Sequence, residues 1–225
     1  MRIESIQVGL PRSYGTAAAQ DWMDQPWTTG YAKQPVRGPV RAGRTNLEGD
    51  GQADRRWHGG PEMAVLAYPA AHYARWREEL RWPQVPNGAF GENLTVEGVT
   101  EDEACLGDVW RAGSAVLQIS EPRKPCKNIS RFWKRADLLK LVQTTGRYGF
   151  YLRVLEEGLV AAGQEIRLAE RPHPDWTVTR AMEARLRLAG RPDEAKALLG
   201  VASLGADWSR QIRAKLERIS KPLRG

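Results

Sequence analysis

The sequence predicts a mainly β protein, with a β-barrel over residues 1–170 and a small three-helix domain over residues 171–225. Many short apolar runs separated by glycine- and proline-rich turns fill the first part, a pattern typical of barrels. The second part instead carries three short helical patterns. The segment Arg171-Pro172-His173-Pro174 between the two parts interrupts both patterns and is typical of a linker.

Each expected element follows from a local pattern. Alternating or β-branched apolar residues predict strands at 2–9, 64–68, 93–96, 109–111, 115–119, 148–155 and 164–168, with short pieces broken by prolines at 33–40. Apolar residues at helical spacing predict helices after Pro69 and at 131–142, 177–188, 192–199 and 206–219. Residues 11–31 show no sustained period and are expected to form a loop.

Composition limits the class of protein. Hydrophobic residues at 41% and charged residues at 27% are typical of a globular protein, and no apolar run reaches the roughly 20 residues of a membrane-spanning helix. Met1 to Ile6 has the pattern of a strand, not of a signal peptide, so a cytoplasmic location is expected. The net charge of +7 leaves nucleic-acid binding as an alternative, although Lys and Arg are spread without a block or a recognisable motif.

Cys126 is the main candidate for chemistry. It follows the expected strand 115–119 in the segment Ser120-Glu121-Pro122-Arg123-Lys124-Pro125-Cys126. The two prolines fix φ and stiffen the chain as it leaves the sheet. Neighbouring cations favour the thiolate, which is the form of cysteine that attacks or binds a metal. The alternatives are a buried, inert cysteine and a disulfide with Cys105, although two cysteines without a secretion signal favour a reducing compartment.

Four further side chains are weaker candidates for binding. His58 precedes Gly59-Gly60, which allows a sharp turn or a close approach of the backbone to a ligand. Asn93 offers donors and an acceptor to a heterocycle, or it stabilises a turn. Lys33 and Arg37 bracket a proline and could hold a phosphate, or they could lie on the surface. The neighbouring Glu92 is expected at the surface, and no zinc spacing is present.

The order of these motifs closely resembles the MOSC family, which is named after the C-terminal domain of molybdenum cofactor sulfurases. The matching motifs, over about residues 25–168, are Lys33-x-x-Val36-x-Gly38, Asp50-x-x-x-Asp54-x-x-x-His58-Gly59-Gly60, Gly88-x-Phe90-Gly91-Glu92-Asn93-Leu94, Gly107-Asp108 and Pro122-Arg123-x-Pro125-Cys126. With its helical tail, the chain is similar to the bacterial YiiM-type branch. Met63 departs from the pattern, because relatives often carry a lysine there.

The resemblance implies a MOSC-type β-barrel that binds the molybdenum cofactor, molybdopterin, with the Cys126 thiolate on molybdenum. It implies pterin and phosphate contacts from Lys33, Arg37, His58, Asn93 and Arg123. Members of this branch reduce N-hydroxylated compounds, including 6-hydroxylaminopurine. Because no flavin or dinucleotide motif is present, electrons are expected from a separate flavoprotein reductase. The alternatives are a sulfur carrier with a persulfide on Cys126 and a basic nucleic-acid-binding module.

Overall fold

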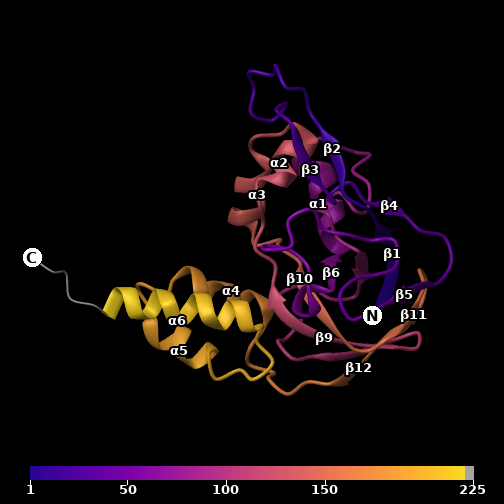
Figure 1. Cartoon of the computed structure of the whole chain (residues 1–225). Helices are drawn as coiled ribbons and strands as arrows, with labels where there is room; N and C mark the ends of the chain where they lie inside the picture. The colour runs from indigo at the N-terminus through magenta and orange to yellow at the C-terminus, as the bar shows by residue number, and fades with distance from the viewer. Residues whose placement is uncertain (221–225) are drawn as a thin grey trace, which may run out of the picture.

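The computed structural model describes residues 1–220 and confirms a mainly β fold with six α-helices, three of which form the tail (Figure 1). Eight strands form one curled sheet in the order β12-β8-β9-β10-β6-β7-β1-β4. Their bounds are β1 Arg2–Val8, β4 Gln34–Pro35, β6 Val65–Pro69, β7 Leu94–Glu97, β8 Val109–Ala112, β9 Ala115–Pro122, β10 Phe150–Glu156 and β12 Ile166–Glu170. All neighbouring pairs are antiparallel except β6 and β7, which run parallel.

The sheet curls far enough for its two sides to meet. The amide of Ile3 in β1 donates to the carbonyl of Gln164 at 2.9 Å, and the amide of Gly163 donates to the carbonyl of Ile3 at 2.7 Å. The amide of Ile166 in β12 donates to the carbonyl of Met1 at 2.9 Å. These bonds satisfy backbone groups that an open sheet would leave unpaired, so the sheet closes into a partial barrel.

Smaller elements cover the ends of this barrel. The hairpin of β2 (Arg12–Tyr14) and β3 (Trp27–Thr29) stands out from one end, and β5 (Val40–Ala42) pairs with β11 (Gly158–Val160) (Figure 1). The 3-10 helix η1 (Pro61–Met63) precedes β6, and α1 (Ala71–Glu79) follows it. Helices α2 (Asn128–Trp133) and α3 (Leu138–Thr145) lie between β9 and β10.

Two local expectations are wrong. Residues 11–31 contain the β2–β3 hairpin as well as a loop. The helix expected over 131–142 is two helices, because Lys134 ends α2 with φ at +54° and so breaks the helical path. The break changes the direction of the chain and leaves α2 as a separate short helix directly after Cys126.

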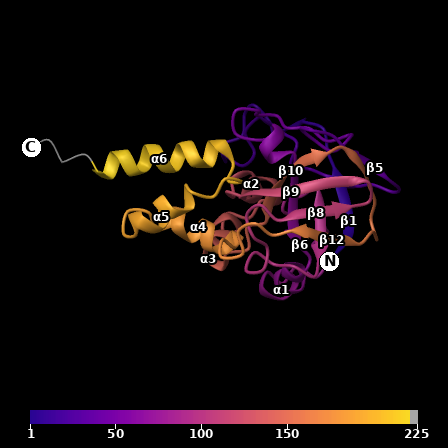
Figure 2. The same cartoon turned by 90° about the horizontal axis from the view of Figure 1, so that it is seen from below.

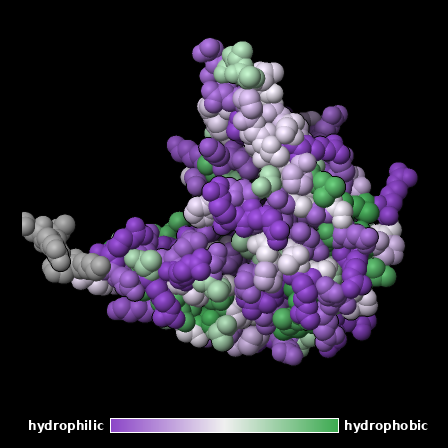
Figure 3. Space-filling view, in the orientation of Figure 1, coloured by the Kyte–Doolittle hydropathy of each residue, from purple (hydrophilic) through white to green (hydrophobic). Residues whose placement is uncertain are grey.

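The C-terminal helices are α4 (Val178–Leu186), α5 (Pro192–Leu198) and α6 (Ala206–Ser220), close to their expected positions. They project to one side of the barrel, and the exposed faces in view are mostly hydrophilic (Figures 2 and 3). Their buried side chains, such as Trp208 and Leu198, belong to the same apolar cluster as Trp110 of the barrel. The tail therefore packs on the barrel through a continuous core, while the division into domains at residues 170/171 stays a prediction.

The last five residues of the predicted tail domain, 221–225, lie outside the described residues. Within residues 1–220, every helix is too short or too polar to span a bilayer.

Candidate functional site

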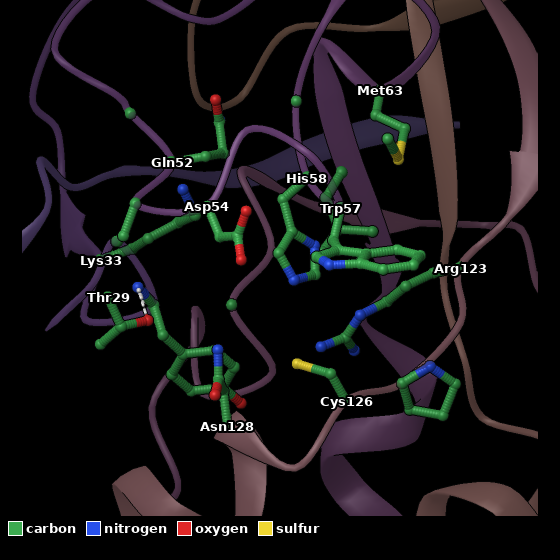
Figure 4. A pocket seen from close by; sticks show the side chains of 18 of the residues that line it. Thr29, Lys33, Gln52, Asp54, Trp57, His58, Met63, Arg123, Cys126 and Asn128 are labelled. Atoms are coloured by element: carbon green, nitrogen blue, oxygen red, sulfur yellow. Dashed lines mark hydrogen bonds between the residues drawn. The ribbon is translucent and has the colours of Figure 1, made fainter. Parts of the chain in front are cut away.

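A cavity of about 500 Å³ opens at the end of the barrel where β9 finishes (Figure 4). Its wall combines the β2–β3 hairpin, the loop after Asp50, the segment between β9 and α2, the start of α2, the residues just before β7, and parts of β6 and β10. Five of the six predicted site residues line it, namely Lys33, His58, Asn93, Arg123 and Cys126. Arg37 does not line it and is exposed to solvent.

Cys126 reaches the cavity because the chain leaves β9 at Pro122 and is fixed on both sides. The amide of Arg123 donates to the carbonyl of Gly149 at 3.0 Å, and the amide of Ile129 in α2 donates to the carbonyl of Cys126 at 3.3 Å. The sulfur of the half-buried Cys126 points into the cavity (Figure 4). Cys105 lies elsewhere, buried, with its thiol donating to the carbonyl of Pro174 at 3.4 Å. Both thiols are free.

His58 is brought beside Arg123 by a tight turn (Figure 4). Gly59 and Gly60 have φ of +82° and +86°, a region that residues with a Cβ rarely adopt. A Cβ at Gly59 would also lie only 2.4 Å from Oε1 of Gln52. Burial lowers the pKa of His58, and the nearby charge of Arg123 lowers it further. His58 is therefore a neutral imidazole at pH 7, able to donate one hydrogen bond and accept another.

Arg123 is a buried cation without a carboxylate partner among residues 1–220. The residue is 3% exposed, and its guanidinium reaches into the cavity near Cys126 and His58 (Figure 4). Its one side-chain hydrogen bond within the described chain goes from Nη1 to the carbonyl of Tyr148, at 3.4 Å. A carbonyl oxygen does not neutralise a guanidinium, and an uncompensated buried charge is costly. The arrangement favours an anionic ligand in the cavity.

Three more cations line the cavity and contact neutral groups. Nζ of Lys124 donates to Oε1 of Gln211 at 3.0 Å. Nε of Arg131 donates to the carbonyl of Met23 at 3.4 Å, and the guanidinium lies 4.5 Å from the ring centre of Trp27.

Lys127 is the third of these cations, and its Nζ lies 6.0 Å from the ring centre of Trp22. The one acidic side chain among the described lining residues is Asp54, which pairs with Arg56 at 3.0 Å. The cavity is therefore strongly electropositive.

Lys33 differs from these cations because its charge is balanced. It forms an ion pair with Asp50, and the two side chains are 7% and 0% exposed. Asp50 also accepts from the amide of Gly9 at 2.9 Å and from Nε2 of Gln52 at 3.3 Å. Burial lowers the pKa of Lys33, while Asp50 acts in the opposite direction. The pair fixes the loop at the cavity edge and leaves little net charge for a ligand.

Asn93 and Glu92 serve the architecture of the sheet. Oδ1 of Asn93 accepts from the amide of Leu66 at 3.0 Å, and Nδ2 donates to the carbonyl of Gln7 at 3.2 Å, so the side chain links β6, β7 and β1. The surface position expected for Glu92 is wrong, because the residue is fully buried. Its carboxylate accepts from the amide of Gly88 at 2.7 Å, from another backbone amide and from two hydroxyls. These bonds compensate the buried charge.

Sequence reasoning missed two side chains at the cavity. Arg131 follows Lys127 by four residues, a spacing that places both on one face of a helix once α2 is recognised. Trp57, next to His58, lines the cavity although it is 67% exposed. The sequence alone could not single out Trp57, because its exposure beside the cavity depends on the conformation of the loop that carries it.

Comparisons with known proteins identify the family. The MOSC domain model matches residues 54–167. The uncharacterized protein YflK of Bacillus subtilis is 42% identical over 191 residues, 85% of this chain and 86% of that protein. Protein YiiM of Escherichia coli is 34% identical over 203 residues, 86% of this chain and 89% of that protein. The chain belongs to the MOSC domain family.

Two further relatives extend the comparison. The crystal structure of YiiM from Geobacillus stearothermophilus superposes with a TM-score of 0.78 at 32% identity, over 96% of this chain and 98% of that one. A protein named reductase from Gibberella moniliformis is 42% identical over 158 residues, which are 67% of this chain and 27% of that longer protein. The matched MOSC region contains Cys126, Arg123, His58 and Asn93 but not Lys33 or Arg37.

Proposed function

We propose that this chain is a reductase of N-hydroxylated compounds that binds the molybdenum cofactor in the cavity, with the Cys126 thiolate as a ligand of molybdenum. The observation that carries the proposal is that one cavity contains both the Cys126 sulfur and the buried guanidinium of Arg123, which has no carboxylate partner among residues 1–220. Membership of the MOSC family and the similarity to a named reductase support an enzyme of this kind. Substrate and metal ligation rest on the family resemblance.

The residues present fit such a cofactor. Molybdopterin carries a phosphate and sulfur ligands, so it brings negative charge into the cavity, where four described cations lack a carboxylate partner. A thiolate is a soft ligand suited to a redox-active metal. Within residues 1–220, no three His, Cys, Asp or Glu side chains gather into a metal site. A metal here would therefore depend on ligands from its own organic group as well as on Cys126.

Different side chains of the cavity would have different roles in binding the cofactor. Arg123 and Lys124 provide positive charge in the cavity that holds Cys126 and are the proposed partners of the anionic groups. Lys33 would shape the edge, because Asp50 already balances its charge. Neutral His58 can orient a polar atom through a hydrogen bond. Trp57 offers an aromatic face at the cavity.

The proposed reaction breaks the N–O bond of the substrate. An N-hydroxylated amine, two electrons and two protons give the amine and one water molecule. The cofactor supplies the electron transfer when it is bound, and the chain binds it, orients the substrate and shields the reaction from bulk water. The electrons would come from a separate flavoprotein reductase in the cytoplasm, which is the location expected from the sequence.

Replacement of the ligand tests this function. Protein from a host that makes the cofactor should contain molybdenum and pterin, and Cys126→Ser should lose molybdenum and reductase activity while its circular dichroism stays native. Cys105→Ala is the matched control, because Cys105 lies outside the cavity wall. Wild-type metal content and activity in Cys126→Ser would remove the proposal. A persulfide on Cys126 in metal-free protein would instead support the sulfur-carrier alternative.

A further inference from the structure

One side chain of the C-terminal helices contacts a residue that lines the cavity. Gln211 lies on α6, and its Oε1 accepts from Nζ of Lys124 at 3.0 Å. The same oxygen accepts from Nη2 of Arg185 on α4 at 2.7 Å. Lys124 belongs to the Cys126 segment and lines the cavity. One amide oxygen thus connects two tail helices with the segment that carries the cysteine.

The acceptor at this position is neutral although two cations converge on it. Neither Lys124 nor Arg185 has a carboxylate within ion-pair distance in the described part of the chain, and the Arg185 guanidinium lies 4.7 Å from the ring centre of Trp208. A carboxylate would bind both cations more strongly than an amide oxygen does. It would also cancel the charge that Lys124 presents at the cavity. Glutamine fixes the position of Lys124 and preserves that charge.

The buried carboxyl group of Glu121 also leaves the positive charge of Lys124 in place. Glu121 is 2% exposed, and its Oε2 has no hydrogen-bond partner within residues 1–220. Gly205, immediately before α6, packs so closely that a Cβ there would lie 2.1 Å from this oxygen. Burial raises the pKa of Glu121 to about 8, so most of its carboxyl groups are uncharged at neutral pH. Glu121 therefore does not neutralise Lys124 under these conditions.

We propose that Gln211 is a positioning residue of the cavity: its amide oxygen holds Lys124 in the cavity wall, two residues from Cys126, as a cation without a carboxylate partner among residues 1–220. The tail thereby completes the binding site for an anionic group. The inference rests on the proposed function for the identity of that group, the anionic cofactor. The position and charge of Lys124 can be measured without any cofactor.

Alkylation of Cys126 provides this measurement on the full chain from a host that lacks the cofactor. Iodoacetate and iodoacetamide are similar in size, and both react with the thiolate, but only iodoacetate is negatively charged. The two alkylation rates at Cys126 are measured by mass spectrometry of the peptide that contains it. Their ratio does not depend on the fraction of thiolate or on the accessibility of the sulfur, which affect both reagents equally. The ratio therefore reports the electrostatic potential at the sulfur. In the wild type the ratio should fall as salt is added, because ions screen the cations.

Gln211→Glu changes the charge of the acceptor with almost no change of shape. We expect the ratio of iodoacetate to iodoacetamide rates to fall roughly three- to tenfold, because a carboxylate would compensate the charge of Lys124 in the wall of the cavity that holds the sulfur. Lys124→Met should give a similar decrease by removing the cation itself. Gln84→Glu is the matched control, since Gln84 is exposed and outside the cavity wall, and should keep the wild-type ratio.

The outcomes separate this inference from the proposed function. A wild-type ratio in folded Gln211→Glu would overturn it. If that variant does not fold, Gln211→Met removes the acceptor at similar length, and its ratio should fall toward that of Lys124→Met; an unchanged ratio would be equally decisive. A lowered ratio together with wild-type protein that never contains molybdenum would refute the proposed function alone. A lowered ratio and lower cofactor content in Gln211→Glu would support both.

Discussion

Glu121 should make the stability of this protein unusually dependent on pH. The perturbation is Glu121→Gln, which removes the ionisable group and keeps the shape. In the native protein, burial dominates and raises the pKa of Glu121 to about 8 from the reference value of 4.5. Glu62 and Asp207 raise it further, and the cations Lys124 and Arg185 oppose them. The unfolded chain loses this proton near pH 4.5, whereas the native protein retains it until about pH 8.

The sign and the size of the effect follow from this difference. Between the two pKa values the native state binds more protons than the unfolded state, so the stability of the wild type decreases as pH rises through the window. The interval is 8 − 4.5 = 3.5 pKa units, and each unit corresponds to about 1.4 kcal/mol, which gives an upper bound of about 5 kcal/mol. We expect roughly 2–5 kcal/mol, because buried groups relax when they ionise.

Urea unfolding of wild type and Glu121→Gln at several pH values between 4 and 9 tests the argument. The difference in unfolding free energy between the two proteins cancels the contribution of every titrating group that does not interact with Glu121. Glu121→Gln should gain stability relative to the wild type from about pH 4.5 to pH 8, and the difference should be constant above that range. Glu217→Gln, on an exposed position of α6, is the control and should follow the wild type. A difference that does not change between pH 5 and 8 would refute the reasoning.

Two further predictions concern the proposed cofactor. Arg123→Gln should lower molybdenum and pterin content, with a loss of at least about tenfold in cofactor affinity if a charge-assisted bond is removed. The control Arg37→Gln, at an exposed position, should retain both molybdenum and pterin. Full cofactor content in Arg123→Gln, or loss of cofactor in Arg37→Gln, would contradict the placement of the anion. The purified protein should not oxidise NADH by itself, because the sequence has no dinucleotide fingerprint, and turnover should begin when a flavoprotein reductase is added; rapid NADH-driven reduction by the chain alone would exclude this scheme.

Local patterns were sufficient for most of the fold. The apolar run 115–119 and the turn Ala112-Gly113-Ser114 predicted the β8–β9 hairpin, which the structure confirms, with Gly113 at a positive φ of +56°. The tail helices also appear near their expected positions, because glycine and proline mark their ends. The two wrong predictions concern Lys134 and the β2–β3 hairpin. At both places the backbone conformation depends on contacts with residues outside the segment.

One such contact lies between the β2–β3 loop and α2. The side chain of Arg131 bonds to the carbonyls of Met23 and Gln25, which fixes the loop against the helix. No pattern within residues 11–31 refers to an arginine more than a hundred residues later. A pairing at such sequence separation is a property of the fold, and sequence periodicity does not report it.

In the candidate site, too, some residues could be recognised from their own segment, whereas the role of others depends on residues distant in the sequence. Cys126 and Arg123 could be singled out from the sequence because their roles depend on the stiff segment that contains them. Lys33 has an equally favourable local pattern, but its charge is balanced by Asp50, which lies 17 residues away. Arg37, only four residues after Lys33, is exposed and outside the cavity wall. The sequence identifies cations, while the fold determines which of them remain uncompensated.

Uncompensated cations have a thermodynamic consequence for the chain without a ligand. Arg123 and Lys124 are held by a carbonyl and an amide oxygen, which satisfy hydrogen bonds but leave the positive charges in a partly dehydrated cavity. Such charges repel each other and lower the stability of the empty native state. An anionic ligand that binds between them removes this repulsion and binds the native state alone, so ligand affinity and stability are linked. Compared with a carboxylate at the same position, a neutral acceptor such as Gln211 gives a less stable protein without ligand but a higher affinity for the anion.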